Sequence, residues 1–245
     1  MTHKSKAVVL RTVKYGESSL IVTMFTELFG LQSYMVKGIR SSGKSAAGKI
    51  SFFQPAALLD AEIYHNPIKH LQYIREYQWA YIYKDVYFDV LKNAVATYIV
   101  EMVLHTIREE EPAQELFEIV ENILLYIDQH EGPQILNIPL VFSLQLASLL
   151  GFRFHGQYTS QTPVLDLQEG RYVQQSPQHG FTLEGETAQI NSFLMYINDI
   201  NLAKDVQISN INRRSLLKCY QQFFSLHLEN YREAKSYQIL RTVLQ

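Results

Sequence analysis

Apolar positions in the first third of the chain fall in short runs that are rich in β-branched and aromatic residues. Gly16, Gly30, the stretch 38–48 and the Asn66-Pro67 pair separate these runs. Short runs of this composition between turn-forming residues are typical of β-strands. The strands that we expect span residues 7–13, 19–26, 31–37, 51–64 and 71–77.

Five short strands within about 75 residues leave little room for helices and predict a small closed barrel, for which the OB-fold is the leading candidate. In the third strand Leu31, Ser33, Met35 and Lys37 share one face, because successive side chains of a strand point to opposite sides. Pro55 breaks the fourth run, so that strand is expected to be interrupted.

From about Tyr81 onward the apolar positions recur with the period of a helix. Val86, Val90, Ala94 and Tyr98 begin one stripe, and a second stripe has glutamates on its wetter side. The helices that we expect lie at about 86–105, 116–127, 139–150, 187–203, 209–229 and 235–244, with Gly151 closing the third of them.

Residues 152–186 interrupt the helical region and are rich in Gly, Gln, Ser, Thr and Pro. This composition predicts irregular structure or a small hairpin. The fold class is therefore α+β with two domains. A five-stranded OB-fold barrel is expected at 1–79, and an all-α helical domain at 80–245 with an irregular insertion at about 152–186.

The formal net charge of −2 hides an asymmetry between these two parts. Residues 1–75 hold ten Lys and Arg against four Asp and Glu, whereas the remainder holds twelve against twenty. A basic head on an acidic body indicates that the head meets a polyanion.

Composition also excludes several classes of protein. No run of 18 apolar residues is present, so a membrane-spanning helix is not expected, and the first residues lack the pattern of a secretory signal. The single cysteine, Cys219, excludes an intramolecular disulfide and a cysteine zinc cluster. A cytoplasmic protein without membrane contact is the expectation.

Gly38 to Ser45 reads GIRSSGKS and matches the phosphate-loop pattern. A nucleotide site of this kind needs a helix that opens directly after Lys44, followed by a crossover to a parallel strand. The sequence after Ser45 continues instead through Ala and Gly into a β-rich run, and no helix of three turns fits before Asp60. A nucleotide hydrolase that uses Gly38–Ser45 is therefore the weaker alternative.

The same loop is better explained as a contact for nucleic acid. Its cations stand among small residues that let phosphates approach, and OB-folds place binding loops between barrel strands. Tyr15 and Tyr34 add rings that can stack on bases, although each ring can equally belong to the barrel core or to an ordinary surface. The predicted DNA-binding residues are Lys6, Arg11, Lys14, Tyr15, Tyr34, Lys37, Arg40, Lys44 and Lys49. An RNA-binding module on the same barrel remains a further alternative.

Catalytic residues, metal ligands and cofactors are not predicted. Ser41 and Lys44 have the spacing of a serine–lysine dyad, but a flexible loop offers no support for an oxyanion. Cys219 lies among apolar residues on a helix and is expected to be a buried hydrophobe. A basic patch on that helix is either a solvated surface or the binding site of an acidic peptide tail, and the tail is the partner that we assign to it; its members are Arg213, Arg214 and Lys218.

The order of short motifs in the first 60 residues resembles the start of the bacterial RecO family of recombination mediators. These motifs are Val9-Leu10, Tyr15-Gly16-Glu17-Ser18, Ile21-Val22, Phe25-Thr26, Gly30, Val36-Lys37-Gly38-Ile39-Arg40 and Gln54-Pro55. Further on, Leu146 to Phe152 (LASLLGF) resembles the helix before that family's metal-binding insertion.

The resemblance implies an OB-fold followed by a helical domain, binding of single- and double-stranded DNA, and annealing of complementary strands. It also implies help in loading recombinase onto strands coated by single-strand-binding protein. The implied partners are RecR, the acidic C-terminal tail of single-strand-binding protein and, indirectly, the recombinase. Many members hold zinc with four cysteines after the LLG helix. The stretch from Arg153 to Gly180 contains none, so we expect no zinc.

Overall fold

A computed structural model describes residues 2–39, 48–107 and 111–243. Its contacts divide the chain into two units. One comprises Met1–Tyr87 and Thr106–Asp128, and the other comprises Phe88–His105 and Gln129–Gln245. The first unit thus joins the barrel to a helix that begins some 30 residues after the last barrel strand. The boundary expected at 79/80 stays a prediction.

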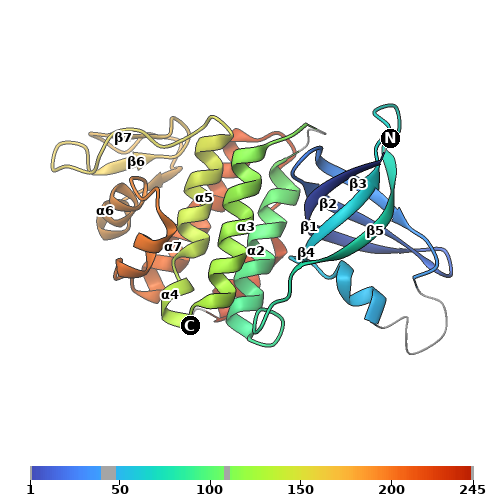
Figure 1. Cartoon of the computed structure of the whole chain (residues 1–245). Coiled ribbons are helices and arrows are strands. Elements are labelled where there is room, and N and C mark those ends of the chain that lie inside the picture. The colour runs from blue at the N-terminus through green and yellow to red at the C-terminus, as the bar shows by residue number, and fades with distance from the viewer. Residues whose placement is uncertain (1, 40–47, 108–110, 244–245) are drawn as a thin grey trace. The chain divides into compact units, whose positions relative to one another are not determined.

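Five strands of the first unit form a closed barrel, as predicted (Figure 1). They run in the order β1-β2-β3-β5-β4, and β3 and β5 are the parallel pair. The order and the closure are those expected of an OB-fold. The strands are β1 (Thr2–Tyr15), β2 (Ser19–Thr26), β3 (Gly30–Val36), β4 (Leu58–Tyr64) and β5 (Leu71–Tyr81).

Apolar side chains from alternate positions of these strands fill the barrel. Tyr34 is one of them and is fully buried. The prediction that Tyr34 stacks on bases is therefore wrong. It shares the inward face of β3 with Val36, while Leu31, Ser33 and Met35 form the outward face, as expected from the alternation.

The region 51–57 is not a strand, contrary to expectation. Residues 48–50 are helical and lead into a short 3-10 helix, η1 (Ser51–Phe53). Phe53 is buried in the barrel core, and its carbonyl accepts a hydrogen bond from the Thr12 hydroxyl at 2.7 Å. Phe52 stacks on Trp79 at 4.4 Å. Packing of these rings, rather than strand pairing, decides the local structure.

Helix α3 (Gln114–Gln129) belongs to the barrel unit. Phe117 packs against Phe25, with ring centroids 5.6 Å apart. Near the end of the helix the buried Asp128 carboxylate accepts hydrogen bonds from the Tyr81 hydroxyl and from the backbone amides of residues 84–86. These bonds fasten the segment after β5 to the helix.

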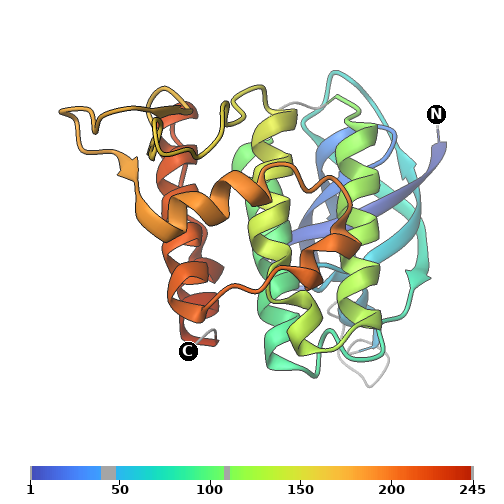
Figure 2. The ribbon, with the colours of Figure 1, turned by 90° about the vertical axis from the view of Figure 1, so that its left-hand side faces the viewer.

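The second unit is mostly helical (Figures 1 and 2). Its first helix begins at Val90 and not near Val86, because the Asp89 carboxylate caps it by accepting from the Lys92 amide at 2.8 Å. Gly151, with φ of 87°, follows the helix that precedes the insertion, as predicted. The helices are α2 (Val90–Thr106), α4 (Gly132–Ile135), α5 (Ile138–Leu149), α6 (Gly185–Leu194), α7 (Asn210–His227) and α8 (Lys235–Val243).

The insertion after α5 contains a small three-stranded sheet. It is more regular than the irregular structure or small hairpin that the composition predicted. Its strands are β6 (Val164–Asp166), β7 (Arg171–Val173) and β8 (Thr182–Leu183), in the order β7-β6-β8. The helix predicted at 187–203 is two shorter elements, α6 and the 3-10 helix η2 (Ile200–Asp205). Asp199 accepts from the Asn201 amide and starts the second one.

Candidate nucleic-acid interface

Strand register aligns the outward side chains of four barrel strands in two rows. Arg11 pairs with Thr23, Thr23 with Ser33, and Ser33 with Leu71. The second row joins Val13, Ile21, Met35 and Tyr73 in the same way. Directly paired residues present their side chains on one side of a sheet. We call these two rows, together with Tyr15, Ser19 and Lys37, the tyrosine face.

The tyrosine face combines exposed rings with positive charge. Tyr15 is 53% exposed and Tyr73 is 39% exposed. The Lys37 ammonium lies over the Tyr73 ring, 5.2 Å from its centroid, which is the geometry of a cation–π contact. Arg11 supplies a second exposed cation, and none of the positions that define this face carries a carboxylate. Rings and cations on one sheet surface suit the bases and the phosphates of a single strand.

The barrel surface formed by β1, β4 and β5 has the opposite character. A hollow of about 450 Å³ on this side is lined by Lys4 and Lys6 and by the carboxylates of Glu27, Asp60, Glu62 and Glu76. We call these six residues the acidic face. Its four carboxylates outnumber its two lysines, so a phosphate backbone is repelled here.

Lys6, a predicted DNA contact, is engaged within the protein. Its ammonium lies 2.8 Å from a carboxylate oxygen of Glu121 on α3, and this hydrogen bond raises the pKa of Lys6. The lysine also pairs across the strands with Asp60. The structure therefore places Lys6 on the acidic face and separates it from Arg11 and Lys37.

The remaining predicted contacts lie around the tyrosine face or outside the described residues. Lys14 is exposed, but it lies opposite the buried Leu20. It therefore occupies the face of β1 that is opposite to the one that carries Arg11 and Val13. Lys49 is exposed in the short helical segment before η1. Arg40 and Lys44 fall among residues that the structure does not describe.

Sequence reasoning missed Tyr73 and Leu71 as members of the interface. A signal was present, since Leu71, Tyr73 and Arg75 alternate along the fifth run. Alternation alone does not say which side faces outward. That information comes from the parallel pairing with β3, which places Tyr73 opposite Met35.

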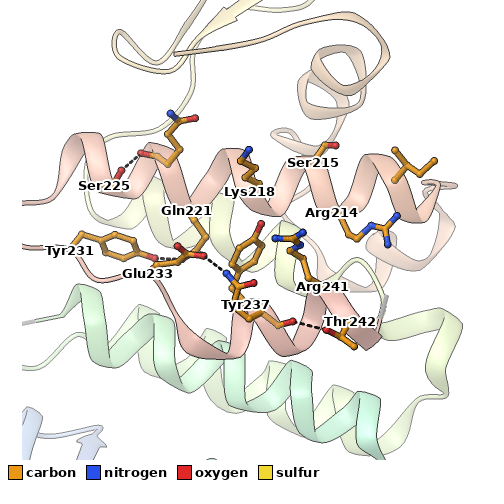
Figure 3. Close-up of a pocket in the computed structure, with 13 residues that line it drawn as sticks. Arg214, Ser215, Lys218, Gln221, Ser225, Tyr231, Glu233, Tyr237, Arg241 and Thr242 are labelled. Carbon is orange, nitrogen blue, oxygen red and sulfur yellow. Dashed lines mark hydrogen bonds between the residues drawn. The ribbon is translucent and has the colours of Figure 1, made fainter. Parts of the chain in front are cut away.

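A second hollow, of about 980 Å³ and basic in character, lies in the helical unit between α7 and α8 (Figure 3). Arg214 and Lys218 line it from α7, and Arg241 lines it from α8. Glu233 is the one carboxylate among its lining residues. Arg241 was not predicted, because its approach to Lys218 depends on how the two helices pack.

Arg213 does not belong to this basic patch, contrary to the prediction. Its side chain is buried, and its guanidinium donates hydrogen bonds to Asn137 at 3.0 Å, to the Ile208 carbonyl at 2.9 Å and to Asn210 at 2.5 Å. Arg213 instead ties α7 to the start of α5.

Cys219 is buried, as expected, and burial raises the pKa of its thiol to about 12. A thiol with so high a pKa is a poor nucleophile at neutral pH. Within the described ranges, no three His, Cys, Asp or Glu side chains gather into a group that could hold a metal ion. No helix of the described residues is long and apolar enough to cross a membrane.

Two family models match the chain, and together they cover both parts of it. The model described as Recombination protein O N terminal matches residues 1–83. The model described as Recombination protein O C terminal matches residues 87–236, which is more than half of the chain. The chain belongs to the RecO family.

Curated relatives in the RecO family align with the chain over almost its whole length. A DNA repair protein RecO from Flavobacterium psychrophilum is 32% identical over 246 residues, with 99% of each chain covered. Those from Flavobacterium johnsoniae and Christiangramia forsetii are 30% and 29% identical, with 99% and 98% of each chain covered. The family resemblance predicted from the short motifs of the first 60 residues is confirmed.

Proposed function

We propose that this chain is a DNA-binding recombination mediator of DNA repair without chemistry of its own. It binds single- and double-stranded DNA, anneals complementary strands and assists the loading of recombinase onto strands coated by single-strand-binding protein. The observation that supports DNA binding most directly is the tyrosine face. Arg11, Tyr15, Lys37 and Tyr73 stand there together on a closed barrel, with no carboxylate in the two rows.

Binding to single-stranded DNA at increasing salt tests the first step. Contacts between cations and phosphates release counterions, so affinity must fall as salt rises. Absent binding, or binding that does not respond to salt, would refute the proposal. The same titration with a duplex and with an RNA of the same sequence separates a DNA mediator from an RNA-binding module. Tighter binding to RNA would favour the second.

The annealing step needs its own measurement. Two complementary strands, each coated with single-strand-binding protein, should anneal faster when the chain is added. Single-strand-binding protein that lacks its acidic C-terminal tail is the control. An annealing rate that changes neither when the chain is added nor when the tail is removed would contradict the mediator role.

We assign the hollow between α7 and α8 to the acidic tail of single-strand-binding protein. Arg214, Lys218 and Arg241 supply three cations against the single carboxylate of Glu233. Exchange of Lys218 and Arg241 for Ala should weaken binding of a tail peptide and leave the affinity for DNA unchanged. RecR is a further proposed partner, and the recombinase is reached indirectly.

A nucleotide hydrolase remains the competing enzyme class. Only Gly38 and Ile39 of the Gly38–Ser45 match lie within the described residues. Between the match and β4, the described helical residues are 48–53, too few for the three turns that a phosphate loop requires. Saturable, magnesium-dependent binding of ATP that is lost in Lys44→Ala would establish the enzyme class instead.

A further inference from the structure

The turn between β4 and β5 presents an isoleucine to solvent. Ile68 is 88% exposed, the highest value among the large apolar side chains of the described residues. A single exposed isoleucine is ordinary on a protein surface. Its significance depends on how rigidly it is held and on what surrounds it.

Hydrogen bonds within the turn hold Ile68 in place. The Ile68 amide donates to the Asn66 side chain at 3.0 Å, and the Lys69 amide donates to the Asn66 carbonyl at 3.0 Å. The buried Gln72 side chain accepts from the Asn66 amide at 2.9 Å and donates to the carbonyls of Asn66 and Lys69. Pro67 further limits the backbone. The tip of the turn is thus ordered before any ligand arrives.

Aromatic rings support the base of the turn. His65 stacks on Phe29 with ring centroids 4.0 Å apart, and His3 meets the same phenylalanine edge-on at 5.2 Å. Strand β1 also pairs with the end of β4 here, where Thr2 lies opposite Tyr64. The turn is therefore anchored to two neighbouring segments of the barrel.

The turn continues directly into the tyrosine face. Leu71, the first residue of β5, lies opposite Ser33 in one of the two rows, and Tyr73 follows on the same side. Lys69 and His70 are exposed between Ile68 and Leu71. Residues 64–75 contain no Asp or Glu. A strand that stacks on Tyr73 and follows β5 backward meets positive charge and then Ile68.

We propose that Ile68 is an apolar wedge that inserts between two neighbouring bases of a bound single strand and unstacks them. The inference rests on DNA binding by the tyrosine face and adds a second contact to it. Apolar side chains inserted between base steps are a known means of unstacking and kinking duplex DNA. To act in the same way on a single strand, Ile68 needs a backbone that is held in place and a phosphate contact beside it. Hydrogen bonds of Asn66 and Gln72 hold the backbone of the turn, and Lys69 supplies the positive charge beside Ile68.

Fluorescence of 2-aminopurine, an adenine analogue that brightens when it is unstacked, tests the wedge. The analogue is placed at successive positions of a short DNA strand, and each strand is saturated with the full chain. We expect brightening at one or two adjacent positions only. Ile68→Ala and Ile68→Ser should abolish it, and Ile68→Met should keep it, because methionine retains the apolar bulk.

Affinity measured by anisotropy separates the possible failures. Ile68→Ala should bind about tenfold more weakly, as expected for the loss of one buried apolar contact. Lys69→Ala should weaken binding in a salt-dependent way and keep the brightening. Ile239→Ala on α8, which removes another exposed isoleucine (51%), should change neither.

Equal brightening in wild type and Ile68→Ala would overturn the wedge, and so would brightening at every position or at none while binding persists. Such results would leave Ile68 an ordinary exposed residue and DNA binding intact. A wild-type chain that binds no strand at all would instead overturn the proposed function, and the wedge with it.

Discussion

The tyrosine face and the acidic face share strand β1, yet they present opposite charge. Lys6 and Arg11 lie five residues apart on this strand, and both are exposed. Lys6 is opposite Asp60 and bonded to Glu121, whereas Arg11 is opposite Thr23 and beside Val13 and Ile21. One strand thus contributes a neutralised cation to one surface and an available cation to the other.

The neighbouring strand explains this difference. The first half of β1 pairs with β4, which carries Asp60 and Glu62, and the second half pairs with β2, whose outward positions are Ser19, Ile21 and Thr23. The register shifts between Val9 and Arg11, where the strand passes from the acidic face to the tyrosine face. A count of lysines and arginines along the sequence cannot separate the two faces. The contrast between the faces can be tested by changing each alone.

Charge reversal should give the largest effect. The double change Arg11→Glu and Lys37→Glu should weaken binding of single-stranded DNA by about a hundredfold at low salt, because two phosphate contacts become repulsive. The slope of log affinity against log salt should fall by about two. Anisotropy titrations at several salt concentrations measure both quantities.

The matched control reverses two cations on the other surface. Lys4→Glu and Lys6→Glu make the same change in net charge, but we expect a loss of less than about threefold, since long-range repulsion is screened. Equal losses in the two double variants would show that net charge, and not the tyrosine face, governs binding.

Asp128 offers a test of stability rather than of binding. Desolvation acts to raise the pKa of its carboxyl, but hydrogen bonds from the backbone of residues 84–86 and from Tyr81 outweigh it and lower the pKa. Asp128→Asn should reduce the free energy of unfolding at pH 7 by about 2 kcal/mol, the scale of hydrogen bonds to a charged group. Urea denaturation measures the change.

The sign of the pH dependence follows from the lowered pKa. A carboxyl with a depressed pKa in the folded state stabilises the protein above its unfolded pKa of about 3.9, and this stability disappears as the pH falls through the folded value. The difference between wild type and Asp128→Asn should therefore be full at pH 7 and shrink below about pH 4. A difference that stays constant down to pH 3 would contradict this origin. DNA binding at pH 7 should not change while the variant remains folded.

Much of the barrel could be predicted from sequence, because the composition of a short segment is enough to indicate a strand. The run 19–26 matches β2 at both ends. The error at 51–57 arose because Phe52 and Phe53 have high strand propensity, but their rings find partners in Trp79, Tyr77 and the barrel core. Such packing joins residues some 25 positions apart and leaves no local signature.

The sequence predicted the type of candidate site, a basic and aromatic surface of the barrel, but not all of the residues that form it. Arg11, Tyr15 and Lys37 do meet on one surface. Tyr34 and Arg213 were assigned to surfaces although both are buried. Alternation along β3 gives two faces without saying which one is inside, and the burial of Arg213 depends on its bond to Asn137, which lies 76 residues away. The bond from Lys6 to Glu121 spans 115 residues and follows from no motif.

Removal of one ring should have an intermediate effect. Tyr73→Ala should weaken binding of single-stranded DNA by about tenfold, because stacking of one base on an aromatic side chain contributes about 1–3 kcal/mol. Tyr73→Phe keeps the ring and should bind as wild type does. Tyr196→Ala, which removes an exposed tyrosine (56%) of the helical unit, is the control and should have no effect. A Tyr73→Phe variant as weak as Tyr73→Ala would point to the hydroxyl instead of the ring.

Single cations on β1 give the smallest expected effect and the sharpest comparison. Arg11→Ala should lower affinity by about threefold and reduce the salt slope by about one, as expected for one phosphate contact. Lys6→Ala should leave both unchanged and cost less than about 1 kcal/mol of stability, because the ion pair that it loses is exposed. Glu121→Gln then asks whether the ion pair alone keeps Lys6 from DNA. We expect no gain in affinity, since Asp60 still lies opposite the freed lysine; a gain would mean that α3 restrains a cation that the barrel could otherwise use.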